Sequence, residues 1–208
     1  MNNNVSRKLI IKAIIPVLLL IAIVISFDLL FPPVAISNLS YGNIKYKLLT
    51  DFFDVIILIP FFVFCLSKHL FWFGRHRRYL VFLLLFLFLI FLLLIIYKFS
   101  LINAYAAFYY LVVIAFFEEI VFRGYIFTVL NQHFSFNSSV VISGIIFGFS
   151  HGLYSFLLFG GCVFSILNFV GGGIIGSYIF SFIYVKTKSL IFPIFFHALL
   201  DFCGFLLL

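Results

Sequence analysis

Hydrophobic and polar positions in this chain alternate in long blocks. Runs of about 20 apolar residues, the length of a helix that crosses a bilayer core, are separated by short polar or basic stretches. This pattern predicts an all-α fold, a polytopic bundle of about seven transmembrane helices. The predicted spans are residues 9–31, 52–73, 79–97, 101–130, 140–159, 161–184 and 190–208.

Composition and charge agree with a membrane protein. Hydrophobic residues make up 66% of the chain and charged residues 9%, and the mean hydropathy is +1.33, which excludes a soluble domain. The net charge of +7 does not indicate nucleic-acid binding, because Lys and Arg gather in short loops. Most of them fall on one side if the N-terminus is cytoplasmic, and this distribution predicts that orientation.

The polar stretches between the first three spans are predicted to lie outside the bilayer. Residues 37–50 form a polar loop with Lys45 and Lys47, and residues 74–78 form a dense basic loop. Asp51 and Asp54 begin the second span, where a helix N-terminus favours acids. We therefore expect both acids at the membrane interface.

The fourth span carries charges that a lipid-facing helix would not. Glu118, Glu119 and Arg123 lie inside it, although a charge near the bilayer centre costs at least about 2.5 kcal/mol. Glu119 and Arg123 are four residues apart and can pair on one helix face, which leaves Glu118 as the surplus acid. An intramembrane acid is a candidate functional group; the alternative is a structural ion pair that locks helix packing.

Two later spans carry polar groups at a depth similar to that of Glu118. His197 and Asp201 are four residues apart, and so are Phe147 and His151, so each pair shares a helix face. We expect these faces and Glu118 to surround one chamber, because facing lipid is costly. Carboxylates and imidazoles in such a chamber can activate water and stabilise an oxyanion.

Glycines recur every four residues in the fifth and sixth spans, which permits close helix approach. They are Gly144, Gly148 and Gly152 in the fifth span, and Gly172 and Gly176 in the sixth.

Three motifs in this order resemble those of the CAAX prenyl endopeptidase and bacteriocin-processing family of intramembrane proteases, which includes the Abi-domain proteins. The motifs are Glu118-Glu119-xxx-Arg123, Phe147-xxx-His151 and His197-xxx-Asp201. The flanking Phe122-Arg123-Gly124 and the segment 189–197 also look like this family. The resemblance covers residues 101–201, and Asp201 stands where Asn is common.

The resemblance implies roles for these residues. Glu118 would be the general base that activates water, with His151 assisting, and His197 and Asp201 would support the oxyanion or bind a metal. Glu119 and Arg123 would form a structural pair, with Phe147 as an aromatic support. The chain would then divide into three N-terminal spans (residues 1–100) and a catalytic core of four spans (residues 101–208) within one integral-membrane domain.

The implied substrate is a peptide or membrane-protein segment reached within the lipid bilayer, with no nucleic-acid partner. The small size is similar to that of bacterial members, so a bacterial cell membrane is expected. No HExxH motif is present, so the usual zinc-protease arrangement is absent. Glu118, His151 and His197 can still supply a zinc site, and a metal-free glutamate mechanism is the alternative.

Two other function classes compete with the protease. A non-catalytic membrane partner, acting in bacteriocin immunity or sensor-kinase modulation, would not require intact motifs. A proton-coupled transporter would use Glu118 and the histidines as a relay, but the sequence shows no inverted repeat.

Overall fold

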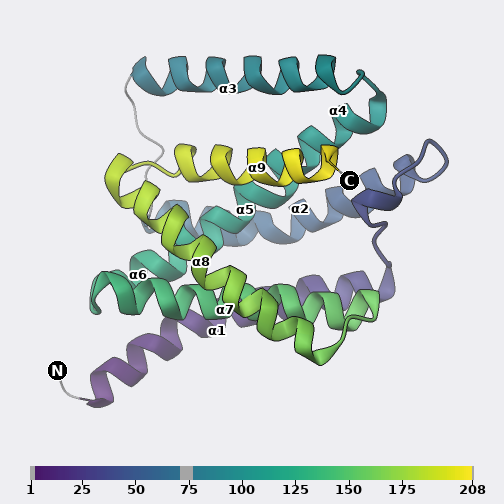
Figure 1. The fold of residues 1–208 in the computed structure, drawn as a ribbon. Coiled ribbons are helices and arrows are strands. Elements are labelled where there is room, and N and C mark those ends of the chain that lie inside the picture. Colours follow the sequence, from purple (N-terminus) through teal and green to yellow (C-terminus); the bar gives the residue numbers. More distant parts are fainter. Residues whose placement is uncertain (1–2, 71–76, 208) are drawn as a thin grey trace.

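The computed structural model describes residues 3–70 and 77–207, with side chains for residues 11, 13–70 and 80–207. Within these ranges the chain is helical and contains no strand, which confirms the predicted all-α class (Figure 1). Apart from one short 3-10 turn, the described residues form seven successive helices, and the fourth is a composite of five segments. The predicted basic loop lies mostly outside the described residues, because only Arg77 and Arg78 of it belong to a described helix.

The helices have these bounds: α1 (Asn3–Leu30), the short η1 (Ile36–Asn38), α2 (Ile44–Ser67), α3 (Arg77–Ile96), α4 (Leu101–Phe108), η2 (Tyr109–Ala115), α5 (Phe116–Glu119), η3 (Ile120–Phe127), α6 (Thr128–Asn131), α7 (Phe136–Phe159), α8 (Val163–Thr187) and α9 (Ile191–Leu206). The segments from α4 to α6 form one continuous fourth helix. Five helices are long and apolar enough to cross a membrane, and the apolar parts of α3 and α9 are shorter. The architecture is therefore a polytopic helical bundle.

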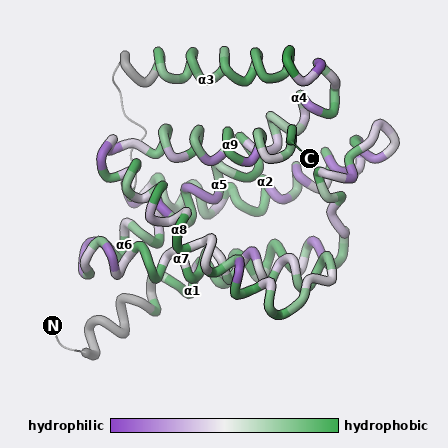
Figure 2. The backbone as a smooth tube through the Cα atoms, in the orientation of Figure 1, coloured by the Kyte–Doolittle hydropathy of each residue, from purple (hydrophilic) through white to green (hydrophobic). Residues whose placement is uncertain are grey.

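Apolar residues predominate along the helices (Figure 2), and many large apolar side chains are exposed on the outside of the bundle. Leu84 and Phe88 of α3 are 58% and 62% exposed, and Leu19 of α1 is 60% exposed. Figure 1 places α3 at one edge of the bundle. An apolar surface of this extent on a soluble monomer would be a liability, whereas it matches a lipid environment.

The second helix begins at Ile44, so the predicted loop over residues 37–50 is wrong in its second half. Lys47 and Asp51 form a buried ion pair with Nζ–Oδ1 at 3.0 Å, and the Tyr105 hydroxyl donates to Asp51. The Lys47 ammonium also lies 3.9 Å from the centre of the Tyr109 ring. Because these groups compensate one another inside the protein, the helix continues through residues that look like loop. Asp51 is consequently buried and lies seven positions after the start of α2, not in its first turn.

The ends of α7 follow capping rules. Ser135 accepts a hydrogen bond from the Ser138 amide at 3.2 Å, as expected of an N-cap residue. Gly160 follows the helix with φ of +68°, a left-handed conformation that favours glycine. The chain then turns back into α8, so α7 and α8 form a hairpin.

Close packing of α7 on α8 depends on glycine. A Cβ atom on Gly148 would lie 2.2 Å from the Phe169 carbonyl oxygen, and one on Gly173 would lie 2.6 Å from the Gly144 carbonyl oxygen. The predicted role of the α7 glycines is thus confirmed. The choice of Gly172 and Gly176 in the next helix was wrong, because a Cβ on Gly172 meets nothing within 4 Å. Among the glycines of α8, Gly173 is the one that packs against α7.

The fourth helix is widened on both sides of its acidic residues. The π-helical segments η2 and η3 flank α5, which contains Glu118 and Glu119. The Thr128 hydroxyl donates to the Arg123 carbonyl at 2.8 Å, five residues earlier. Single π turns change the angular positions of the residues around them and are frequent at functional sites.

Candidate functional site

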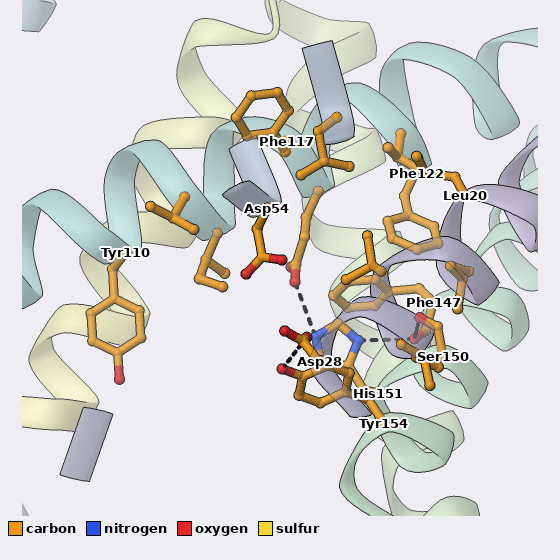
Figure 3. A pocket seen from close by; sticks show the side chains of 18 of the residues that line it. Leu20, Asp28, Asp54, Tyr110, Phe117, Phe122, Phe147, Ser150, His151 and Tyr154 are labelled. Atoms are coloured by element: carbon orange, nitrogen blue, oxygen red, sulfur yellow. Dashed lines mark hydrogen bonds and ion pairs between the residues drawn. The ribbon is translucent and has the colours of Figure 1, made fainter. Parts of the chain in front are cut away.

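The polar side chains predicted to share a chamber do line one pocket. Its volume is about 620 Å³, and its walls come from α1, α2, the fourth helix, α7 and α9 (Figure 3). Glu118, His151, His197 and Asp201 all belong to the lining. The structure thus brings together the four residues predicted to be catalytic, and their chemical roles stay predictions.

Glu118 and His151 form an acid–base pair on the pocket wall. His151 Nε2 lies 3.2 Å from Glu118 Oε1, and the two side chains are 36% and 19% exposed. His151 Nδ1 lies 3.0 Å from the Phe147 carbonyl oxygen, and both interactions are dashed in Figure 3. A carbonyl only accepts, so Nδ1 carries a proton and donates it. The Nε2–carboxylate contact then requires a second proton shared between Glu118 and His151.

His197 lies between three carboxylates. Its Nδ1 lies 2.8 Å from Glu119 Oε1, and its Nε2 lies 3.6 Å from Glu118 Oε2 and 3.5 Å from Asp201 Oδ2. The Phe180 ring of α8 stacks on the imidazole with ring centres 4.8 Å apart. Glu119 therefore fixes the ring through Nδ1, which turns Nε2 toward Glu118 and Asp201.

Glu119 and Arg123 form the ion pair that their spacing predicts, with Nη1–Oε1 at 3.0 Å and both side chains 0% exposed. The Arg123 guanidinium lies between two aromatic rings, 4.9 Å from the centre of Phe147 and 5.0 Å from that of Phe180. Cation–π contacts of this kind stabilise a desolvated guanidinium. Phe147 also packs on His151, with ring centres 4.4 Å apart.

Sequence reasoning missed the link from Glu119 to His197, which lie 78 positions apart along the chain. It also missed Ser143, whose buried hydroxyl donates to the Phe122 carbonyl at 3.0 Å and ties α7 to η3. No spacing within one helix signals a contact between two helices. Both contacts help to hold the histidine-bearing helices against the fourth helix.

Acids and tyrosines outside the three motifs also line the pocket. They are Asp28 of α1, Asp54 of α2, Tyr109 of η2 and Tyr154 of α7. The Tyr154 hydroxyl donates to Asp28 Oδ2 at 2.8 Å (Figure 3). Asp54 was predicted in the first turn of the second span, and the structure corrects this because α2 starts ten positions before it. A signal for Asp28 was present, since an acid inside the first predicted span is itself a functional candidate.

The zinc site predicted from Glu118, His151 and His197 stays a prediction. Among the described residues, no group of three or more His, Cys, Asp or Glu side chains is placed to hold a metal ion. The two Nδ1 atoms are engaged by the Phe147 carbonyl and by Glu119. Both Nε2 atoms face the Glu118 carboxylate itself. We therefore derive no chemical step through a metal.

Comparison with known proteins gives one family. The family model described as Rce1-like, type II CAAX prenyl endopeptidase, matches residues 100–203, half of the chain. No curated protein matches the chain, and no solved structure does. The matched region runs from Ser100, the N-cap of α4, into α9 and contains all four residues predicted to be catalytic. Helices α1 to α3 lie before it.

Proposed function

Because the chain belongs to the Rce1-like type II CAAX prenyl endopeptidase family, we propose that it hydrolyses a peptide bond inside the membrane with water activated by Glu118. Family membership supports a CAAX-type endopeptidase, and with five candidate spans the chain is an integral membrane protein. Its substrate is accordingly a peptide or protein in a lipid bilayer. The observation that carries the finer proposal is the contact of the Glu118 carboxylate with two imidazoles at an open pocket.

In the proposed reaction Glu118 removes a proton from a water molecule in the pocket. The water oxygen attacks the scissile carbonyl carbon, and the Glu118 carboxylate, held in place by its contact with His151, keeps the proton taken from the water. Collapse of the tetrahedral intermediate breaks the carbon–nitrogen bond, and the same proton passes to the leaving amine. General acid–base catalysis by such a pair typically contributes about 100-fold or more to the rate.

His197 is proposed to stabilise the oxyanion. Its Nδ1–H donates to Glu119, and the three carboxylates around the ring favour the imidazolium form. The Nε2–H of that form points into the pocket where the carbonyl oxygen of the substrate would lie. Asp201 lies 3.5 Å from the same Nε2 and accepts its hydrogen bond when no substrate is bound. A fixed donor aimed at a developing negative charge is worth about 100-fold or more in rate.

A comparison of membrane peptides tests the proposal in cells. Mass spectrometry of cells with the wild-type chain and with Glu118→Ala at equal expression should show products that depend on Glu118, and their precursors should accumulate in the variant. A phenotype that Glu118→Ala retains in full, with no peptide difference, would contradict the protease and favour the non-catalytic partner.

We also propose that the N-terminus lies in the cytoplasm of a bacterial cell. The start of α1 lies at one end of the bundle, together with the turn between α6 and α7 and the turn between α8 and α9, and the end of α9 lies at the other (Figure 1). Lys186 and Lys188 mark the α8–α9 turn, and cytoplasmic loops carry an excess of such residues. Reporter fusions at the two termini should give opposite locations.

A further inference from the structure

The pocket has a second acidic wall, built by helices that precede the family-matched region. Asp28 of α1 and Asp54 of α2 form this wall, and they line the same pocket as Glu118 and His151. Figure 3 shows both aspartates on the same pocket as His151 and Tyr154. The proposed hydrolysis uses neither of them.

Each of the two aspartates has an oxygen without a partner. Asp28 is 1% exposed, and its Oδ2 accepts from Tyr154. Within the described part of the chain, Asp28 Oδ1 and Asp54 Oδ1 are buried and have no hydrogen-bond partner. A buried acceptor that is left unsatisfied is unfavourable, and more so when it is charged. Two such oxygens on one pocket are therefore placed for a donor that comes from outside the chain.

The charges around this wall do not balance. Asp28, Asp51 and Asp54 lie close enough to interact electrostatically, together with Lys47. Lys47 is already paired with Asp51 at 3.0 Å and rests on the Tyr109 ring. Among the ion pairs of the described side chains, none joins Asp28 or Asp54 to a basic group. The donor that suits this wall is therefore a cation.

We propose that Asp28 and Asp54 form an acidic subsite that binds the Lys or Arg side chain of a substrate residue near the cleaved bond. The proposal rests on the proposed peptidase function and specifies its substrate class. A substrate ammonium or guanidinium would satisfy both Oδ1 atoms with charge-assisted hydrogen bonds. Apolar residues of α1 in the same lining, among them Leu20, Ile21 and Val24, would pack on the aliphatic stem of that side chain.

The subsite lies near the proposed reaction centre. Tyr109, which lines the pocket, interacts electrostatically with Glu118 and also with Asp51 and Asp54. Tyr154 interacts with Asp28, Asp54 and Tyr109 and lies one helical turn after His151. A residue held by the acidic wall would thus be close in the substrate sequence to the bond that Glu118 attacks.

Matched peptides test the subsite. Each pair carries Lys or norleucine at one position around the cleaved bond, since norleucine keeps the stem and lacks the ammonium. At one position we expect the wild-type chain to cleave the Lys peptide with a kcat/KM at least about tenfold higher. In the Asp28→Asn/Asp54→Asn double variant that ratio should fall to near one. Tyr110→Phe removes a hydroxyl from the same pocket, away from the two aspartates, and should retain the preference. Both peptides of a pair are measured on the same protein sample, so a smaller amount of folded protein lowers both kcat/KM values equally and does not change their ratio.

Binding separates failure of the subsite from failure of the peptidase. Fluorescence anisotropy of the same labelled peptides on Glu118→Gln protein should show the Lys preference without cleavage. One outcome is that the wild-type chain cleaves and binds the Lys and norleucine peptides of every pair equally well. That result would overturn the subsite and leave the peptidase intact. A Lys preference in binding that the double variant loses, with no cleavage by the wild-type chain, would support the acidic subsite and overturn the peptidase.

Discussion

At the residue scale, the Glu119 carboxylate joins the structural and chemical parts of the site. Its Oε1 atom contacts both Arg123 and His197, so one buried oxygen neutralises the guanidinium and orients the imidazole. The spacing of Glu119 and Arg123 was enough to predict their pair. The second contact needed the tertiary fold, because it joins α5 to α9.

Glu119→Gln should destabilise the protein by about 3–5 kcal/mol, because it leaves Arg123 as an uncompensated buried charge. Thermal unfolding in detergent measures this effect. The double variant Glu119→Leu/Arg123→Met removes both charges and should be less destabilised than Glu119→Gln. A wild-type melting temperature for Glu119→Gln would contradict the structural role of the pair.

Asp201→Asn should keep most of the activity, because an amide oxygen can accept from His197 Nε2 in place of Oδ2. Asp201→Leu removes the acceptor and should be much less active. Asn cannot titrate, so the activity of Asp201→Asn should vary with pH differently from that of the wild-type chain. Peptidase assays between about pH 5 and pH 9 measure both effects. Identical pH profiles for Asn and Asp would show that the charge of Asp201 has no part in the reaction.

At the scale of elements, the length of the apolar runs predicted each helix. The start of α2 was predicted too late, because charged residues that pair inside the protein were interpreted as a loop. Lys47 and Asp51 look like polar loop until their mutual contact is known. The π-helical segments around α5 are too short to change the hydrophobic periodicity of the sequence in a detectable way. The fourth helix was therefore predicted in extent and not in internal geometry.

The hairpin of α7 and α8 gives a prediction with an internal control. Gly148→Ala would place a Cβ 2.2 Å from the Phe169 carbonyl oxygen, so the helices must separate at a cost of about 1–3 kcal/mol. His151 lies one turn after Gly148, and activity should fall as well. Gly172→Ala makes the same change in open space and should melt and cleave like the wild-type chain. Equal melting temperatures for the two variants would contradict the described packing.

At the scale of the whole molecule, the pocket depends on both halves of the chain. The family-matched region supplies the predicted catalytic residues, and α1 and α2 supply part of the wall, including Asp28 and Asp54. The sequence predicted the catalytic cluster through spacings within single helices and a family resemblance. It did not predict the acidic wall, because Asp28 and Tyr154 are 126 positions apart and neither belongs to a motif.

Removal of metal should leave the activity unchanged, because the described residues offer no group of three ligands. Treatment with EDTA or 1,10-phenanthroline, followed by a cleavage assay, measures this. Elemental analysis of the purified protein is the control and should give well under one zinc per chain. Stoichiometric zinc, with activity lost on its removal and restored on its return, would contradict the metal-free arrangement.

The most direct test of the central claim is single-turnover cleavage of a membrane peptide by purified protein in lipid vesicles, with the wild-type chain compared with Glu118→Gln. We predict that the variant binds the peptide and cleaves it at least about 100-fold more slowly. Tyr110→Phe, which removes a hydroxyl from the same pocket, should cleave at close to the wild-type rate. Cleavage by folded Glu118→Gln at the wild-type rate would contradict the account.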